Sequence, residues 1–117
     1  MNPLSYSLCC ETVTLYRQQG ETVLRQVIPN CHMRAQHSTP AEPYGKSMEK
    51  RFLLIIPEDV PLCCGDRIYR GIGPEAVDWQ SFVPATVQEL YEVSFAKPCF
   101  WEGEFAHWEA GNRKEHL

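Results

Sequence analysis

The chain has 117 residues, of which 44% are hydrophobic and 22% are charged, and its formal net charge is −4. This length fits one domain and leaves no room for two, and the composition is that of a globular protein rather than a disordered one. The acidic balance argues against a protein that holds nucleic acid by its phosphates, since such proteins usually present a basic face.

The start of the chain does not have the pattern of a secretory leader, because residues 1–10 lack a basic start and a long apolar stretch. No apolar run approaches the roughly 20 residues of a membrane span, and the longest strong run covers residues 52–56. We therefore expect a protein that stays in the cytosol without membrane contact. Residues 1–10 are expected to form a flexible N-terminal arm and residues 113–117 a charged C-terminal tail, on either side of a domain at 11–112.

Short segments rich in β-branched and aromatic residues alternate with turn signals along the chain. No window of twelve or more residues has the period of an amphipathic helix. Pro29–Asn30 is expected to be a corner between two strands, and Pro98 is expected to end another. In chain order, the predicted strands cover residues 12–16, 22–28, 31–36, 49–56, 67–71, 91–97 and 105–110.

These signals predict an all-β fold, a small single-domain β-barrel of about six or seven short antiparallel strands with long loops. A barrel is preferred to a two-sheet sandwich because one short set of strands with long excursions suits a closed sheet better. The apolar run at 52–56 predicts a strand that is buried on both faces, or on one face by the core and on the other by a partner. Ile55 is accordingly expected to lie in the core.

The sequence contains no motif that concentrates catalytic groups at a short spacing. It has no GxSxG elbow and no papain-type cysteine signature. Gly65, Gly71 and Gly73 are interpreted as turn glycines, because no predicted helix follows them to bind a phosphate. His107, beside Trp108 in the last predicted strand, is expected to face outward. We therefore predict a protein that is not an enzyme and uses no cofactor.

Six cysteines are present, at positions Cys9, Cys10, Cys31, Cys63, Cys64 and Cys99. Because cytosolic thiols stay reduced, we expect free side chains that are buried or half-buried. Zinc is the alternative, but structural zinc sites usually take two thiolates from a CxxC-type turn. The adjacent pairs Cys9–Cys10 and Cys63–Cys64 chelate poorly, since neighbours in a strand point to opposite faces. No metal ligand is predicted.

Several short motifs follow one another in a recognisable order across residues 11–112. They are Thr14–Leu15–Tyr16, Cys31–His32–Met33, Ile55–Ile56–Pro57, Gly65–Asp66–Arg67–Ile68 with Gly71, and His107–Trp108–Glu109–Ala110–Gly111. This order resembles that of small proteins from the structural-gene clusters of tailed phages and prophages of Gram-positive bacteria, often labelled minor capsid or head–tail connector proteins. The cysteines, Trp79 and Trp101 are not part of the pattern.

The resemblance implies a head-completion protein, or stopper, which forms a ring of small β-barrels under the portal. Its partners would be the portal or adaptor and tail proteins and other copies of itself, with passive contact to DNA in the channel. It would be found in the cytoplasm of the bacterial host during assembly and then in the neck of the virion. A long loop would project into the channel, which here is the proline-containing segment 37–48. Its candidate contact residues are His37, Ser38, Thr39, Pro40, Glu42, Tyr44 and Lys46.

Two other functions stay open. A small barrel that binds a peptide or another cytosolic protein would use aromatic residues near its loops, and the candidates are Trp79, Phe82 and Trp101, with Phe100. Aromatic residues in a loop more often hold it against its own domain. An oligonucleotide-binding barrel would interleave aromatic and basic residues on a strand face. Tyr69, between Arg67 and Arg70, is the nearest approach to that pattern.

Overall fold

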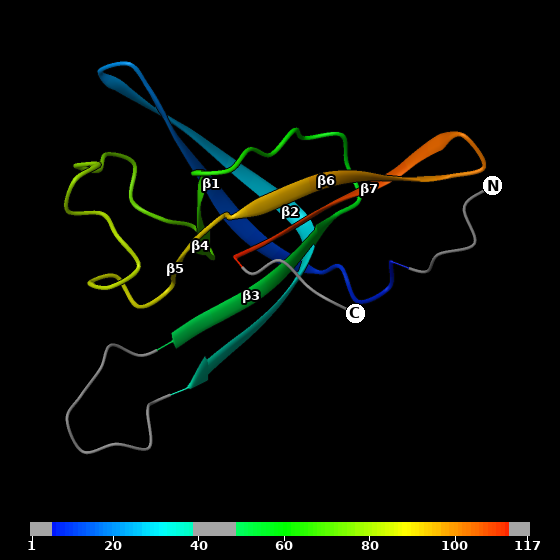
Figure 1. Cartoon of the computed structure of the whole chain (residues 1–117), viewed down its shortest axis with the longest axis horizontal. Coiled ribbons are helices and arrows are strands. Elements are labelled where there is room, and N and C mark those ends of the chain that lie inside the picture. The colour runs from blue at the N-terminus through cyan, green and yellow to red at the C-terminus, as the bar shows by residue number, and fades with distance from the viewer. Residues whose placement is uncertain (1–5, 39–48, 113–117) are drawn as a thin grey trace.

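A computed structural model describes residues 6–38 and 49–112, which fold into one curled antiparallel sheet (Figure 1). Its strands are β1 (Glu11–Gln19), β2 (Thr22–Ser38), β3 (Glu49–Ile56), β4 (Arg67–Arg70), β5 (Leu90–Glu92), β6 (Phe95–Trp101) and β7 (Glu104–Gly111). The order across the sheet is β5-β4-β1-β2-β3-β7-β6, and the sheet curls into a half-barrel. The predicted all-β fold with antiparallel strands is confirmed. The described residues contain no helix that is long and apolar enough to cross a membrane.

β2 is one continuous strand where the sequence predicted two. The expected corner at Pro29–Asn30 is a bulge, at which Asn30 has a φ of 59° and the β1–β2 register shifts. A bulge bends a strand and increases its twist without ending it, and it also tolerates a proline. The first half of β2 therefore pairs with β1 and its second half with β3, so that β2 is shared by both halves of the curled sheet.

The chain between β5 and β6 joins the two edges of the sheet. The sequence predicted one strand ending at Pro98, whereas β5 stops at Glu92 and β6 runs through Pro98 to Trp101. β6 is an edge strand, where a proline need not break a ladder. At the crossing, the Val93 carbonyl accepts from the Gly65 amide at 2.8 Å, and the Ser94 amide donates to Gly111 at 2.7 Å. These bonds tie the β4 side of the sheet to the β7 side and hold its curl.

The core lies on the inner face of the curl, and β3 shows how the strands supply it. Phe52, Leu54 and Ile56 are buried, whereas Leu53 and Ile55 are half-buried. Burial of both faces within the domain was therefore the wrong expectation, and Ile55 belongs to the outer face. That a partner covers this outer face stays a prediction. The fully or nearly buried members of the main core include Val13, Leu15, Ile28, Met33, Leu54, Ile56, Ile68, Tyr91 and Val93.

The β2–β3 hairpin extends beyond the rest of the sheet (Figure 1). β3 pairs with β7 only from Leu53 to Ile56, while its ladder with β2 continues to the Ser38–Glu49 pair. The predicted loop was therefore placed two residues too early, because His37 and Ser38 belong to β2. The other contact candidates of that loop, Thr39, Pro40, Glu42, Tyr44 and Lys46, lie outside the described residues, as does the tail at 113–117.

Candidate functional site

Exposed aromatic side chains gather at the turn between β6 and β7. Phe100 is 61% exposed and Trp101 42% exposed. The two-residue turn of Glu102 and Gly103 has positive φ at both positions, 50° and 82°, which matches the right-handed twist of a tight hairpin. The Phe100 ring meets Phe105 edge-on, with 6.2 Å between the ring centroids. We call Phe100, Trp101 and Phe105 the aromatic tip, and of the predicted aromatic contact residues it contains Trp101 and Phe100.

The other two aromatic candidates hold the 72–89 loop against the domain. Phe82 is buried and packs edge-on against Tyr16, with centroids 4.8 Å apart. Trp79 is half-buried beneath Arg67, whose guanidinium carbon lies 3.7 Å from the ring centroid. The same guanidinium donates to the carbonyls of Trp79 and Phe82 at 2.5 and 2.6 Å. As a contact surface Phe82 is therefore the wrong candidate, because its ring is covered by its own domain.

The basic and aromatic residues considered for nucleic acid binding are already engaged inside the protein. Besides Trp79, Arg67 contacts Glu92 at 3.4 Å, and Arg70 contacts Glu11 at 2.9 Å. Tyr69 is half-buried and stacks on Phe82. A stacking platform needs free aromatic faces and free cations, and these side chains do not offer them.

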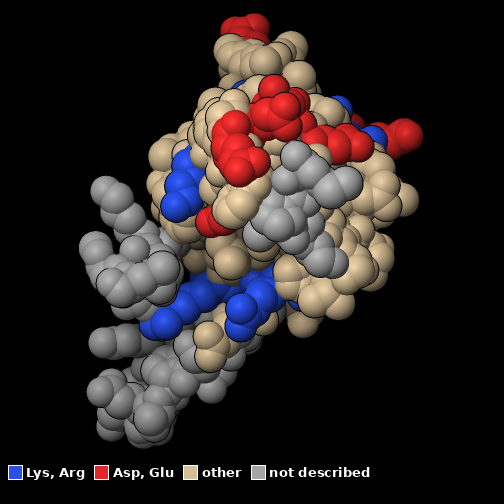
Figure 2. All heavy atoms as spheres, turned by 90° about the vertical axis from the view of Figure 1, so that its right-hand side faces the viewer, with Lys and Arg blue, Asp and Glu red and all other residues tan. Residues whose placement is uncertain are grey.

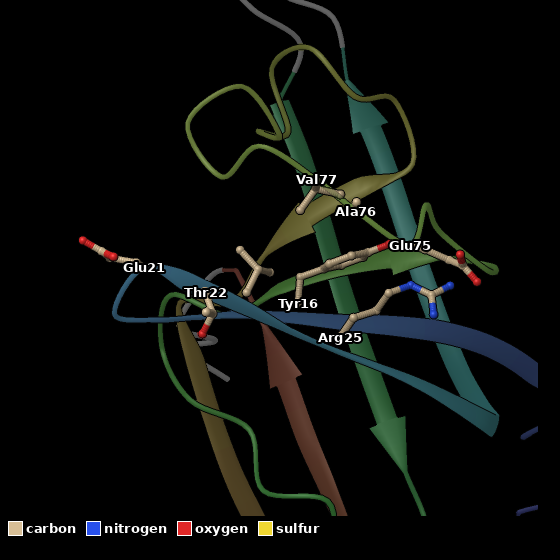
Figure 3. A pocket seen from close by; sticks show the side chains of 8 residues that line it. Tyr16, Glu21, Thr22, Arg25, Glu75, Ala76 and Val77 are labelled. Carbon is tan, nitrogen blue, oxygen red and sulfur yellow. The ribbon is translucent and has the colours of Figure 1, made fainter.

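A pocket of about 330 Å³ lies between the β1–β2 hairpin and the 73–77 segment. Figure 3 shows Tyr16 and Arg25 reaching toward that segment while Glu21 points away. The Tyr16 hydroxyl donates to the Pro74 carbonyl at 2.6 Å, and the Arg25 guanidinium donates to Gly73 and Pro74 at 2.6 and 3.0 Å. The hydroxyl of Tyr16 and the guanidinium of Arg25 thus hold the wall of the pocket and are not free to orient a ligand.

A second cluster, which the sequence did not predict, lies on the β6–β7 hairpin. Cys99 is directly opposite His107 in the ladder, and Glu109 follows two residues further along β7. The sulfur, imidazole nitrogen and carboxylate oxygen of these residues all lie within 4.8 Å of one another. His107 Nε2 is 2.9 Å from Glu109 Oε2, and His107 Nδ1 is 2.9 Å from the Tyr6 hydroxyl.

His107 was expected to face outward, and it does lie on the outer face of β7 with Glu109, but Tyr6 covers it and its side chain is buried. Cys99 pairs with His107 but Phe100 pairs with Phe105, so β7 has an extra residue at Ala106. A bulge of this kind bends the strand locally. After it, β7 alternates regularly, with Trp108 and Ala110 packed against the core and His107 and Glu109 on the other face. The only sign of the cluster in the sequence was that Cys99 is followed, after a turn, by His107 and Glu109 two residues apart. Its meaning depends on a register that the residue pattern does not reveal.

The electrostatics of the cluster do not favour an activated cysteine. Burial raises the pKa of the Cys99 thiol to about 11, assisted by its hydrogen bond to Glu109 and by the negative charge there. Burial would also raise the pKa of Glu109, but hydrogen bonds from His107 and Cys99 outweigh it and hold that pKa below its usual value. A cysteine nucleophile needs a lowered pKa. The protonated Cys99 donates to a carboxylate instead, so the cluster is not arranged for attack on a substrate. A metal ion at this place would have to displace the thiol proton.

All six cysteines are free thiols. Cys31 is buried and Cys9 and Cys99 are half-buried, as expected, whereas Cys10, Cys63 and Cys64 are exposed. Cys63 and Cys64 lie in the segment that leads into β4 rather than in a strand.

No protein-family model, curated protein or solved structure matches this chain.

Proposed function

We propose that the protein is a structural subunit of the head–tail connector of a tailed phage or prophage, acting as a stopper-like ring component at the neck. The observation that carries the proposal is the pair of unlike projections from one small domain. The β2–β3 extension and the aromatic tip lie at opposite ends of the molecule (Figure 1). In this role the chain catalyses no reaction, assembles in the cytoplasm of the bacterial host and ends in the virion.

A closed ring needs two different surfaces on each subunit, because each copy contacts the next through a heterologous interface. The aromatic tip suits one of them, since Phe100 and Trp101 are exposed and aromatic residues are enriched in the buried centres of interfaces. The adjoining strand β6 is a sheet edge, whose unpaired backbone groups can bond to another chain. The β2–β3 extension is then directed away from that contact and is available to reach the channel.

Charge distribution supports an oriented contact at this end of the molecule. Figure 2 looks at the side on which Figure 1 shows the β6–β7 turn. Acidic side chains gather in the upper part of that face, with basic ones at its margins and a larger basic group below. Glu102 and Glu104 in and beside the turn are exposed. Complementary charges at an interface fix orientation and suppress wrong partners. The resemblance of the motif order to phage neck proteins points to the same role.

The proposal is tested by assembly on the portal complex encoded in the same genome, imaged by electron cryomicroscopy. We expect ring density below the portal with the wild-type chain. The Phe100→Ser/Trp101→Ser variant should lose that density while remaining folded, because its changes are confined to exposed side chains. Ile72→Ser is the matched control, since Ile72 is 71% exposed in a loop away from the tip. Absence of ring density with the wild-type chain would overturn the stopper role.

A peptide-binding module remains the second candidate, and the open edge of β6 favours it. An extended peptide can add a strand to such an edge, with the aromatic tip supplying side-chain contacts. A chain that stays off the portal but captures a defined peptide, and loses it in the Phe100→Ser/Trp101→Ser variant, would support this alternative.

A further inference from the structure

We infer that Cys99, His107 and Glu109 form a zinc-binding site on the β6–β7 hairpin. This inference does not depend on the proposed function. The three residues supply one sulfur, one imidazole nitrogen and one carboxylate oxygen, and these atoms converge within 4.8 Å. Thiolate, imidazole and carboxylate are the three ligand types that proteins use for Zn²⁺.

The spacing of the donor atoms is close to what zinc requires. Zinc bonds of about 2.0–2.3 Å in tetrahedral geometry place neighbouring donors roughly 3.3–3.8 Å apart. The most distant donors here, up to 4.8 Å apart, need to approach by about 1 Å, and His107 Nε2 and Glu109 Oε2, at 2.9 Å, need to separate slightly. Rotations of the three side chains would supply both changes. The fourth position is left to water or to a group from a partner. Cys99 and Glu109 are half-buried, so an ion can reach the site from solvent.

The surroundings of His107 match those of a metal-bound histidine. A ligating histidine almost always holds its second nitrogen in a hydrogen bond that fixes the tautomer and the ring orientation. His107 is only 6% exposed, and its Nδ1 is held by the Tyr6 hydroxyl at 2.9 Å. Its Nε2 points to Glu109, at 2.9 Å. An ion placed between these two atoms would replace one hydrogen bond by two metal bonds, with Tyr6 still orienting the ring.

The site would link two segments that are far apart in the chain. Tyr6 belongs to the short segment before β1, whereas His107 is in β7, and their rings also meet edge-on with centroids 5.7 Å apart. Lys97 is opposite Glu109 in the ladder and its cation opposes a metal ion, but Lys97 is exposed and can turn into solvent. Bound zinc would therefore fasten the N-terminal segment to the base of the aromatic tip.

The test is a zinc titration of the full chain after chelator treatment under reducing conditions, with bound metal measured by elemental mass spectrometry. We expect one zinc ion per chain, and with Co²⁺ in its place a thiolate-to-cobalt charge-transfer band. Cys99→Ser and Glu109→Gln should weaken binding more than tenfold. The Cys63→Ser/Cys64→Ser variant is the control for unspecific thiol binding and should bind as the wild type does. Tyr6→Phe should weaken binding about tenfold, the usual effect of losing such an outer hydrogen bond.

Two results would overturn the inference. One is a wild-type chain that binds no zinc at micromolar concentrations, which would leave a plain His–Glu pair. The other is zinc binding that persists in Cys99→Ser or disappears in Cys63→Ser/Cys64→Ser. Because His107 is buried and its replacement can unfold the hairpin, X-ray absorption of the zinc-loaded wild type provides an independent measurement. A shell with one sulfur and otherwise nitrogen or oxygen neighbours is expected, and two or more sulfurs would contradict the site.

Discussion

Lys50 holds the end of the long 72–89 loop through its ammonium group. Its Nζ donates to the carbonyls of Pro84, Val87 and Gln88 at 2.6–2.8 Å, and it lies 5.5 Å from the centroid of the Tyr91 ring. Burial lowers the pKa of Lys50 from its usual 10.5, and the nearby carboxylate of Glu89 opposes that shift. One charged group thus satisfies several backbone carbonyls that would otherwise need water.

Replacing Lys50 by Met should lower the free energy of unfolding by about 1–3 kcal/mol, because the carbonyls lose a charged donor while the apolar stem is kept. Chemical denaturation measures the change. Hydrogen exchange of the amides in 85–90 should increase in the same variant. Arg34→Met is the control, since Arg34 is exposed on β2, and it should change stability little. Equal stability of both variants would show that the Lys50 contacts contribute nothing.

Cysteine chemistry differs by position in a way that alkylation can measure. Burial raises the pKa of Cys31 to about 12, with smaller contributions from Cys9, Glu58 and Glu11. Only the thiolate reacts, so Cys31 in the folded chain should stay unmodified by iodoacetamide as the pH rises from 7 to about 10. The exposed Cys63 and Cys64 should be alkylated over the same range, as peptide mass spectrometry would show. Modification of Cys31 at the rate of the exposed pair would mean that the core opens.

At the scale of the element, successive side chains of a strand alternate between the core face and the outer face of the sheet, and β3 illustrates the consequence. The uninterrupted apolar run from Phe52 to Ile56 hides a two-residue period that only the curled sheet reveals. Leu54 points into the core and is fully buried, whereas Ile55 is half-buried on the outer face. Leu54 and Ile55 are neighbouring apolar side chains of similar size, but they therefore contribute unequally to the free energy of unfolding.

Leu54→Asn should unfold the domain or cost about 4 kcal/mol or more, because it leaves an unpaired amide and a cavity in the core. Ile55→Asn is the matched substitution one residue away, and it should cost only about 1 kcal/mol. Thermal denaturation followed by circular dichroism compares the two. Similar losses at both positions would mean that the outer face of β3 is covered as tightly as the inner one.

At the scale of the whole molecule, the curl depends on a close approach at Gly111. This residue pairs with Leu53 on one side and Phe95 on the other, where the two edges of the sheet are joined. A Cβ at Gly111 would lie 2.8 Å from the Phe52 carbonyl oxygen and 2.6 Å from the Phe95 ring. The backbone oxygen cannot move aside as a flexible side chain can.

Gly111→Ala should therefore push β7 away from β3 and lower the free energy of unfolding by about 1–3 kcal/mol, the usual cost of overpacking. Ser94→Ala is the control in the same junction, since the Ser94 side chain is exposed. Hydrogen exchange at Ser94 should increase in Gly111→Ala, because its amide donates to Gly111. An unchanged stability would show that the junction tolerates a wider spacing.

The sequence by itself determined the class of the fold and several of its local features. Alternating β-branched residues predicted the strands, and the bounds of β3 agree with the prediction residue for residue. At the turn of Glu102 and Gly103, the backbone has positive φ at both positions, and glycine supplies it at little cost. These features follow from interactions between residues that are near one another in the chain.

Only the tertiary structure decided how the strands are joined and which side chains meet. Pro29 and Pro98 were predicted to break strands, but a bulge and a sheet edge accommodate them. The Cys99–His107 pair depends on the register of β6 with β7, and the contact of Tyr6 with His107 joins positions 101 residues apart. Such contacts depend on bulges, edges and long-range pairing, for which a local residue pattern carries no signal.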